Sequence, residues 1–235
     1  MKNLLLALVF LLLSTTSYGQ KKNKNAKPAP VNHDSLVYAM AMYVGDTSAA
    51  INALYQMNVK SPNNTDKLYS LAVLYFEKRA FDQAINVCNL ILKQNSKHIK
   101  GLQLLAICYQ QDDNASGAIL VYQQLDSISP GANNRYQMAT IMYQIKKYQE
   151  ALNLLENIIS DSLLMKETMN MNYQNSDKQN LNQNVSTQAA AYNMAGFILM
   201  ENGDMDNAKS FFEKALQIQP DFQLAKGNLA YIQKK

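Results

Sequence analysis

Histidine and cysteine, which supply many catalytic and metal sites, are scarce in this chain of 235 residues, with two of each. His33 and His98 lie far apart, and neither has a partner at the spacing of a metal site or of a nucleophile and its base. The chain also has no glycine-rich loop of the kind that holds phosphate. We therefore expect no catalytic residue, no metal and no cofactor, and we do not expect an enzyme.

Long hydrophobic runs are missing except for one near the start. Residues 4–13 are ten consecutive apolar residues that follow Lys2, and Ser17 and Gly19 then fit the small-x-small rule for cleavage. Ten residues are too few to span a bilayer, which needs about 20. We expect a cleavable signal peptide at 1–19 and export, most plausibly to a bacterial periplasm, with no integral membrane segment after cleavage. An uncleaved signal anchor that tethers the chain to the membrane and release outside the cell stay open as alternatives.

The excess of positive charge lies in the first part of the chain. Residues 20–33 contain four lysines and two prolines, and Val31 is their one large aliphatic residue, so we predict a flexible basic linker. Five of the 22 Lys and Arg precede Asp34, which leaves 17 against 18 Asp and Glu in the rest of the chain. This balance gives no excess of positive charge for a nucleic acid to bind.

Glycine and proline are sparse, with eight and five residues, and alternation typical of strands is nearly absent. Apolar residues recur instead at helical spacing. One such set follows Ile99 and a second follows Ala118, with a polar break at 111–114 between them. This pattern predicts an antiparallel pair of helices.

Alanines recur at nearly constant spacing. Ala50, Ala84, Ala118 and Ala151 are separated by 34, 34 and 33 residues, and Ala208 follows after 57 more. A period of about 34 residues is typical of a helix-turn-helix solenoid.

The repeat resembles the tetratricopeptide (TPR) family, which places a bulky residue, Leu, a small residue and Tyr on its first helix, then Ala, an aromatic residue and often Pro on its second. Residues 99–131 match with Leu102, Leu105, Ala106, Tyr109, Ala118, Tyr122 and Pro130. The resemblance implies an all-α fold, a right-handed superhelical solenoid of about five repeats. The expected boundaries within 34–235 are repeats at 34–64, 65–98, 99–131, 132–165 and 189–222, an insertion at 166–188 and a capping helix at 223–235.

Two parts of the chain depart from this pattern. In the first repeat Tyr38 stands where a small residue belongs, so we expect a shortened first helix that ends at Gly45 and Asp46. The insertion is rich in Asn and Gln, and we predict a mobile loop there, with a lid or partner-specific loop as the alternative.

Three methionines lie close together near the start of the insertion. Met165, Met169 and Met171 could bind Cu(I), although packing is the ordinary use of methionine.

Cys88 and Cys108 fall on neighbouring helices of the repeat register. Export would permit a disulfide between them. The alternative is two buried thiols that pack as small hydrophobic groups.

The resemblance also implies a binding surface, because first helices line a concave groove in this family. The Lys, Asn and Arg clamp with which some members hold carboxyl-terminal peptides is absent, since Tyr69 and Val73 occupy matching positions. We expect a non-enzymatic scaffold or adaptor of the cell envelope that binds a peptide or helix of a protein partner. The alternatives are a self-associating structural array and a metal or small-molecule binder that uses the methionine segment. The expected concave-face residues are Tyr69, Val73, Phe76, Gln103, Ile107, Gln110, Tyr136, Thr140, Tyr143, Asn193, Phe197 and Met200.

Overall fold

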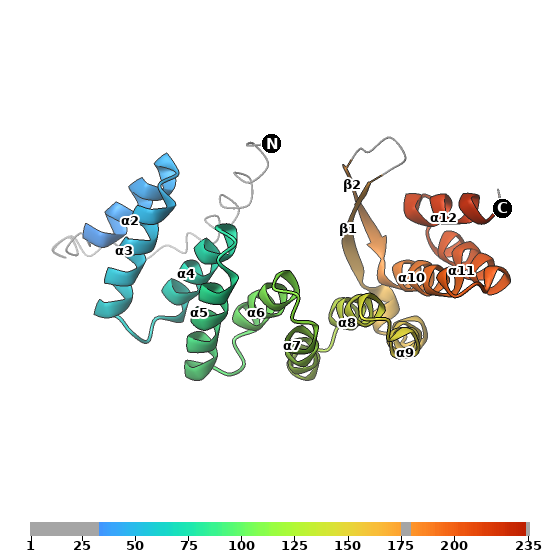
Figure 1. Ribbon diagram of the computed structural model, residues 1–235, viewed down its shortest axis with the longest axis horizontal. Helices are drawn as coiled ribbons and strands as arrows, with labels where there is room; N and C mark the ends of the chain where they lie inside the picture. The colour runs from blue at the N-terminus through green and yellow to red at the C-terminus, as the bar shows by residue number, and fades with distance from the viewer. Residues whose placement is uncertain (1–32, 175–179, 234–235) are drawn as a thin grey trace, which may run out of the picture.

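The computed structural model describes residues 33–174 and 180–233, and eleven α-helices make up most of this part of the chain. Consecutive helices pack as antiparallel pairs that follow one another along an arc (Figure 1). This architecture confirms the predicted all-α fold of TPR-like repeats. The helices are α2 (His33–Val44), α3 (Thr47–Lys60), α4 (Thr65–Glu77), α5 (Phe81–Gln94), α6 (Ile99–Gln111), α7 (Ala115–Ile128), α8 (Ala132–Gln144), α9 (Tyr148–Ser160), α10 (Thr187–Glu201), α11 (Met205–Ile218) and α12 (Gln223–Gln233).

Small residues occupy the places where the repeat register puts the crossing of two paired helices. Ala72 of α4 and Ala84 of α5 are fully buried, and so are Ala106 and Ala118 of the next pair. In the last pair Gly196 of α10 takes the place of alanine. A Cβ added there would lie 3.1 Å from the carbonyl oxygen of Ala208, which shows how closely α10 and α11 approach.

The turn between the helices of each pair uses one residue in the left-handed region. Gly45 and Gly203 have φ of 77° and 85°, while Arg79, Asp113 and Lys146 occupy the equivalent place with φ of 59°, 54° and 63°. The amide that follows closes the turn onto the helix before it, as in the hydrogen bond from Lys147 N to Met142 O (2.8 Å). This is a Schellman motif, which requires the left-handed residue.

Lys146→Gly should therefore raise the free energy of unfolding by about 0.5–1 kcal/mol, because a non-glycine residue in this conformation costs about 1–2 kcal/mol and glycine loses part of that gain in the unfolded chain. Urea denaturation measures the change. Gly203→Ala is the reverse control, since a Cβ there meets nothing within 4 Å and only the backbone is tested. A loss of stability in Lys146→Gly would contradict this account of the turn.

The first repeat is close to the predicted form. Its helix α2 has 12 residues and ends at Val44, before the turn at Gly45 and Asp46. Tyr38 is half-buried and packs against the first hydrophobic cluster. The helix begins at His33, which we had placed in the linker; residues 1–32, with the predicted signal peptide and the rest of the linker, lie outside the described residues.

The prediction of a mobile loop in the insertion is wrong for its described residues, which form a β-hairpin. Strands β1 (Thr168–Gln174) and β2 (Asn180–Ser186) pair antiparallel, with Thr168 opposite Ser186 and Asn172 opposite Asn182. Met169 and Val185 are buried on one face, while asparagines cover the other. The period of two was present in the sequence, but the abundance of amides obscured it.

The base of the hairpin is joined to the helices on both sides. Glu167 Oε2 accepts a hydrogen bond from Ala132 N (3.0 Å) and so caps α8, whose own N-cap Gly131 has no side chain. Thr187 Oγ1 donates to Leu164 O (2.8 Å) in the 3-10 turn Leu164–Lys166. Helix α10 thus begins at Thr187, two residues before the predicted start of the last repeat.

Candidate functional site

The hairpin rises from the inner side of the arc, above α8 and beside α10 (Figure 1). Most of the residues predicted for the concave face are half-buried or exposed, and Gln103 and Ile107 of α6 are the most open. Tyr136, Asn193 and Met200 are instead buried, so they cannot contact a partner in this conformation. The structure thus leaves nine of the twelve predicted positions at least partly accessible: Tyr69, Val73, Phe76, Gln103, Ile107, Gln110, Thr140, Tyr143 and Phe197.

Aromatic rings meet at the end of α8. The ring of Tyr143 lies edge-on to Phe197 of α10, with centroids 5.7 Å apart, and 5.9 Å from Tyr148 of α9. Burial raises the pKa of Tyr143, as do the nearby Glu201 carboxylate and Tyr148. The neutral ring therefore offers an apolar contact surface with a hydroxyl at its tip.

Several polar residues of the predicted face are already engaged by neighbouring residues. Gln110 Oε1 accepts a hydrogen bond from Tyr122 Oη (2.9 Å), and Asn193 Oδ1 accepts one from Asn228 Nδ2 (2.9 Å). Thr140 Oγ1 donates to Tyr136 O (3.0 Å). These hydrogen bonds stabilise the array and leave fewer donor and acceptor groups on these side chains for a partner.

One side chain closes the base of the outer edge of β2. Gln219 accepts a hydrogen bond from Ser186 N at Oε1 (2.8 Å) and donates from Nε2 to Asn184 O (3.1 Å). These bonds show that even-numbered residues of β2 point their backbone groups outward. In an antiparallel pair the residues opposite them must do the same on β1.

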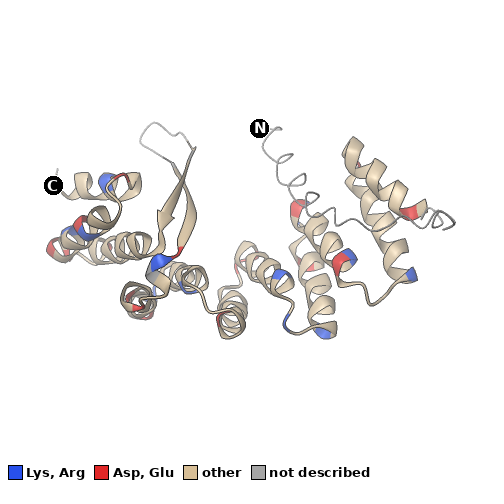
Figure 2. Ribbon diagram, turned by 180° about the vertical axis from the view of Figure 1, so that it is seen from behind, with Lys and Arg blue, Asp and Glu red and all other residues tan. Residues whose placement is uncertain are grey.

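The outer edge of β1 is open. Among the described residues, no hydrogen bond reaches the outward backbone groups of Thr168, Asn170 or Asn172. Neither strand carries a charged residue, as Figure 2 shows. Natural proteins usually protect a free edge with charges, prolines or bulges, and this edge has the backbone groups that pair with an extended peptide.

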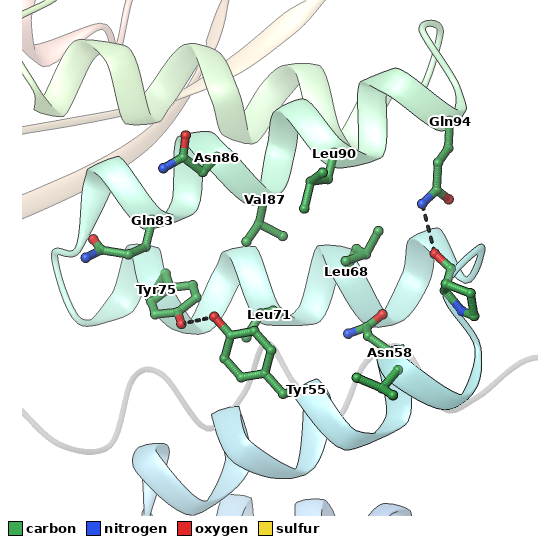
Figure 3. Close-up of a pocket in the computed structure, with 12 residues that line it drawn as sticks. Tyr55, Asn58, Leu68, Leu71, Tyr75, Gln83, Asn86, Val87, Leu90 and Gln94 are labelled. Atoms are coloured by element: carbon green, nitrogen blue, oxygen red, sulfur yellow. Dashed lines mark hydrogen bonds between the residues drawn. The ribbon is translucent and has the colours of Figure 1, made fainter.

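A groove that the sequence did not reveal lies between α3 and α5 over α4 (Figure 3). It has a volume of about 560 Å³ and a largely apolar lining that includes Leu68, Val87 and Leu90. At one end the hydroxyls of Tyr55 and Tyr75 form a hydrogen bond of 2.6 Å, and burial and this bond raise the pKa of Tyr75 to about 12. The sequence feature that could have indicated this groove is a pair of apolar residues outside the core register, Val59 and Leu90, which are mostly exposed.

Cys88 and Cys108, the candidates for a disulfide, are free thiols in this structure, and both are fully buried. Burial raises the pKa of Cys88 to about 12 and that of Cys108 to about 11. The neighbouring Cys108 raises the pKa of Cys88 further, and the Asp112 carboxylate raises that of Cys108. At neutral pH both are protonated and poor nucleophiles.

These pKa values predict a loss of stability in alkali. The unfolded thiols ionise near pH 9, whereas the folded thiols keep their protons to about pH 11–12, so stability is full below pH 9 and falls as the pH rises through this window. We expect the free energy of unfolding to drop by about 1–2 kcal/mol between pH 8 and pH 9.5. Urea denaturation at both pH values measures it. Cys88→Ala should remove the part of this dependence that Cys88 contributes, and an unchanged slope in that variant would exclude this thiol as a source.

Two further expectations concern metals and membranes. Met169 is buried and Met171 half-buried on β1, so both contribute to packing. Within residues 33–174 and 180–233, no three His, Cys, Asp or Glu side chains gather in a way that could hold a metal ion. None of the helices in the same ranges is long and apolar enough to cross a membrane.

Curated relatives match only part of this chain. An uncharacterized protein ycf37 of Pyropia yezoensis is 52% identical over 44 residues, which are 19% of this chain and 25% of the relative. The signal recognition particle subunit SRP72 of Dictyostelium discoideum is 33% identical over 82 residues, which are 35% of this chain and 12% of the relative. The chain thus spans a quarter or less of the length of these proteins.

Solved structures show the same fold over most of the chain. The MamA protein has a TM-score of 0.60 at 18% identity and covers 80% of this chain and 90% of its own. YrrB, described as a TPR protein with an unusual peptide-binding site, has a TM-score of 0.57 at 15% identity over 81% of this chain and 87% of its own.

Family descriptions agree with this fold. Tetratricopeptide repeats match residues 41–108 and 189–222, and the description of anaphase-promoting complex, cyclosome, subunit 3 matches residues 77–158. With the repeat register, the paired helices and the structural neighbours, these matches show that the chain belongs to the tetratricopeptide-repeat family.

Proposed function

We propose that this protein is an exported, non-enzymatic adaptor of the bacterial cell envelope that holds an extended peptide of a partner protein on its concave side, against the open edge of β1. The fold supports the general role, since proteins of this family serve as scaffolds for protein–protein interaction. The observation that carries the specific role is the asymmetry at the base of the hairpin, where Gln219 closes the outer edge of β2 and no described residue bonds to the outer edge of β1.

Three features favour a peptide over a charged ligand. The strands carry no charge, the nearby α6 presents Gln103 and Ile107, and α8 and α10 present the rings of Tyr143 and Phe197. Aromatic anchors contribute much of the binding free energy in such interfaces. The peptide-binding site described for YrrB is consistent with this use of the fold.

Affinity capture from envelope extracts tests which face binds. The double variant Gln103→Lys/Ile107→Lys places two charges on the concave face of α6. We expect it to retain at most about a tenth of the partner that the parent retains. Its matched control is Asn86→Lys/Leu90→Lys, which changes one polar and one apolar exposed residue at the same spacing in the groove between α3 and α5. Loss of the partner in the control alone would instead assign binding to that groove.

A second pair of variants tests the strand edge. Asn172→Pro removes an outward N–H from β1 without breaking the bonds between the strands, so we expect it to weaken capture and leave the fold intact. Asn182→Pro makes the same change directly opposite, on the outer edge of β2. Equal capture by the parent and both variants would show that the partner does not pair with β1.

Export is tested separately. The signal peptide predicts that the protein recovered from cells begins at Gln20, which amino-terminal sequencing determines. A start at Met1 would support the signal anchor instead.

A further inference from the structure

Helix α2 presents a stripe of large apolar side chains at the first end of the array. Leu36, Met40 and Val44 follow one another at every fourth position and are 57%, 63% and 63% exposed. Tyr43 beside them is 88% exposed. This spacing is that of a helix face that packs against another element, and here no described element covers it.

The stripe borders two shallow hollows along α2 and α3. The larger has a volume of about 570 Å³ and an apolar lining that includes Leu36, Val37, Met40 and Val44 of α2 and Ala49 of α3. The smaller continues along α3 past Ala53. Together they form the surface on which another helix of a longer array would rest.

The other end of the array differs in kind. In α12, the helix that closes the described array, Tyr231 is the one large apolar side chain that is mostly exposed. Repeat arrays need a polar outer face at their ends. The last repeat therefore has such a face. The first repeat has an apolar face instead, and an exposed apolar face of this kind marks an interaction site.

The segment just before α2 is unsuited to cover this stripe. Residues 20–32 contain Val31 as their one large aliphatic residue, and they carry four lysines. A lipid surface is also a poor fit, because helices that bind membranes carry basic residues on their polar face. Helix α2 has no Lys or Arg, and its one acidic residue, Asp34, is paired with Lys60 at 2.6 Å.

The charge pattern fits a second copy of this chain. Residues 35–44 carry no charged side chain, as the tan ribbon of this helix beyond Asp34 shows in Figure 2. Two such helices related by a two-fold axis bring Leu36, Met40 and Val44 of each copy together without opposing like charges.

We propose that the α2 stripe is a homodimer interface, in which α2 of one copy packs antiparallel against α2 of another. Because one helix of 12 residues supplies the contact from each copy, we expect an interface of the small class, below about 1,200 Å² in total, and a dimer that dissociates on dilution. The interface is at the end of the array, away from the hairpin, and does not depend on the proposed peptide site.

Sedimentation velocity over a dilution series tests the interface with the protein from Gln20 onward, which keeps every described residue. We expect the parent to pass from dimer to monomer on dilution and Met40→Lys to raise the dissociation constant at least about tenfold, since it buries a charge in an apolar contact. Leu120→Lys is the matched control. Leu120 is an apolar residue of α7 with 66% exposure, close to that of Met40, and it lies outside the stripe.

A parent that stays monomeric throughout the series would overturn the proposal, and so would equal dimerisation of Met40→Lys and the parent. Flotation with vesicles of phosphatidylethanolamine and phosphatidylglycerol is the second readout. A monomeric parent that floats with the vesicles, and a Met40→Lys variant that does not, would assign the stripe to a lipid surface instead. Circular dichroism confirms the fold of each variant.

Discussion

Val185→Asp is expected to lower the free energy of unfolding by about 3–5 kcal/mol, because it places an unpaired carboxylate in a buried site. Val185 of β2 is fully buried, in a hydrophobic cluster that also contains Met169 of β1, Ala189 of α10 and Phe222. The hairpin is thus part of the core of the second half of the array. Urea denaturation followed by circular dichroism measures the loss.

Asn182→Asp is the matched control, since it adds the same charge to the exposed face of the same strand. Its expected effect is within about 0.5 kcal/mol. If Val185→Asp were as mild as this control, the hairpin would be detached from the core, and the open edge of β1 could not serve as a fixed wall of the binding site.

The repeat architecture was predictable because its cause is local and periodic. Each pair of helices needs a small residue at its crossing and a left-handed residue in its turn, so Ala84, Ala118 and Ala151 recur with the period of the fold. The turns are harder to read, since Arg79 and Lys146 stand where Gly203 stands in the last repeat. The family pattern compensates for this because it weights the whole repeat rather than any one residue.

The binding surfaces were less predictable because exposure depends on neighbours from other parts of the chain. Tyr136, Asn193 and Met200 share the register of exposed or half-buried residues in the second and third repeats but are buried. Asn193, for example, receives a hydrogen bond from Asn228, 35 residues later. Likewise, the difference between the two edges of the hairpin comes from Gln219, which bonds to the outer edge of β2 from 33 residues away. A register that repeats every 34 residues carries no information about these contacts.

The second large effect is expected at Gly196, where alanine should lower the free energy of unfolding by about 1–2 kcal/mol. The added Cβ would lie 2.9 Å from Cε1 of Phe212 and 3.1 Å from the carbonyl oxygen of Ala208, both closer than a Cβ ordinarily approaches another heavy atom. Phe212 is fully buried, so its ring cannot turn outward to relieve the contact. Overpacking costs about 1–3 kcal/mol, and the helix propensity of alanine offsets up to about 1 kcal/mol of it.

Gly227→Ala is the control, because Gly227 is an exposed residue within α12 and a Cβ there meets nothing within 4 Å. This change should raise stability by about 0.5–1 kcal/mol through helix propensity alone. The two substitutions are chemically identical, so the difference in their sign isolates the contact between α10 and α11.

Phe212→Leu in the Gly196→Ala background provides the decisive comparison. Truncating the ring removes the group that the new methyl group meets, so the double variant should lose less stability than the sum of the two single losses, by about 0.5 kcal/mol or more. Strict additivity would mean that Gly196 and Phe212 are not in contact, and the close crossing of the last repeat would then be wrong.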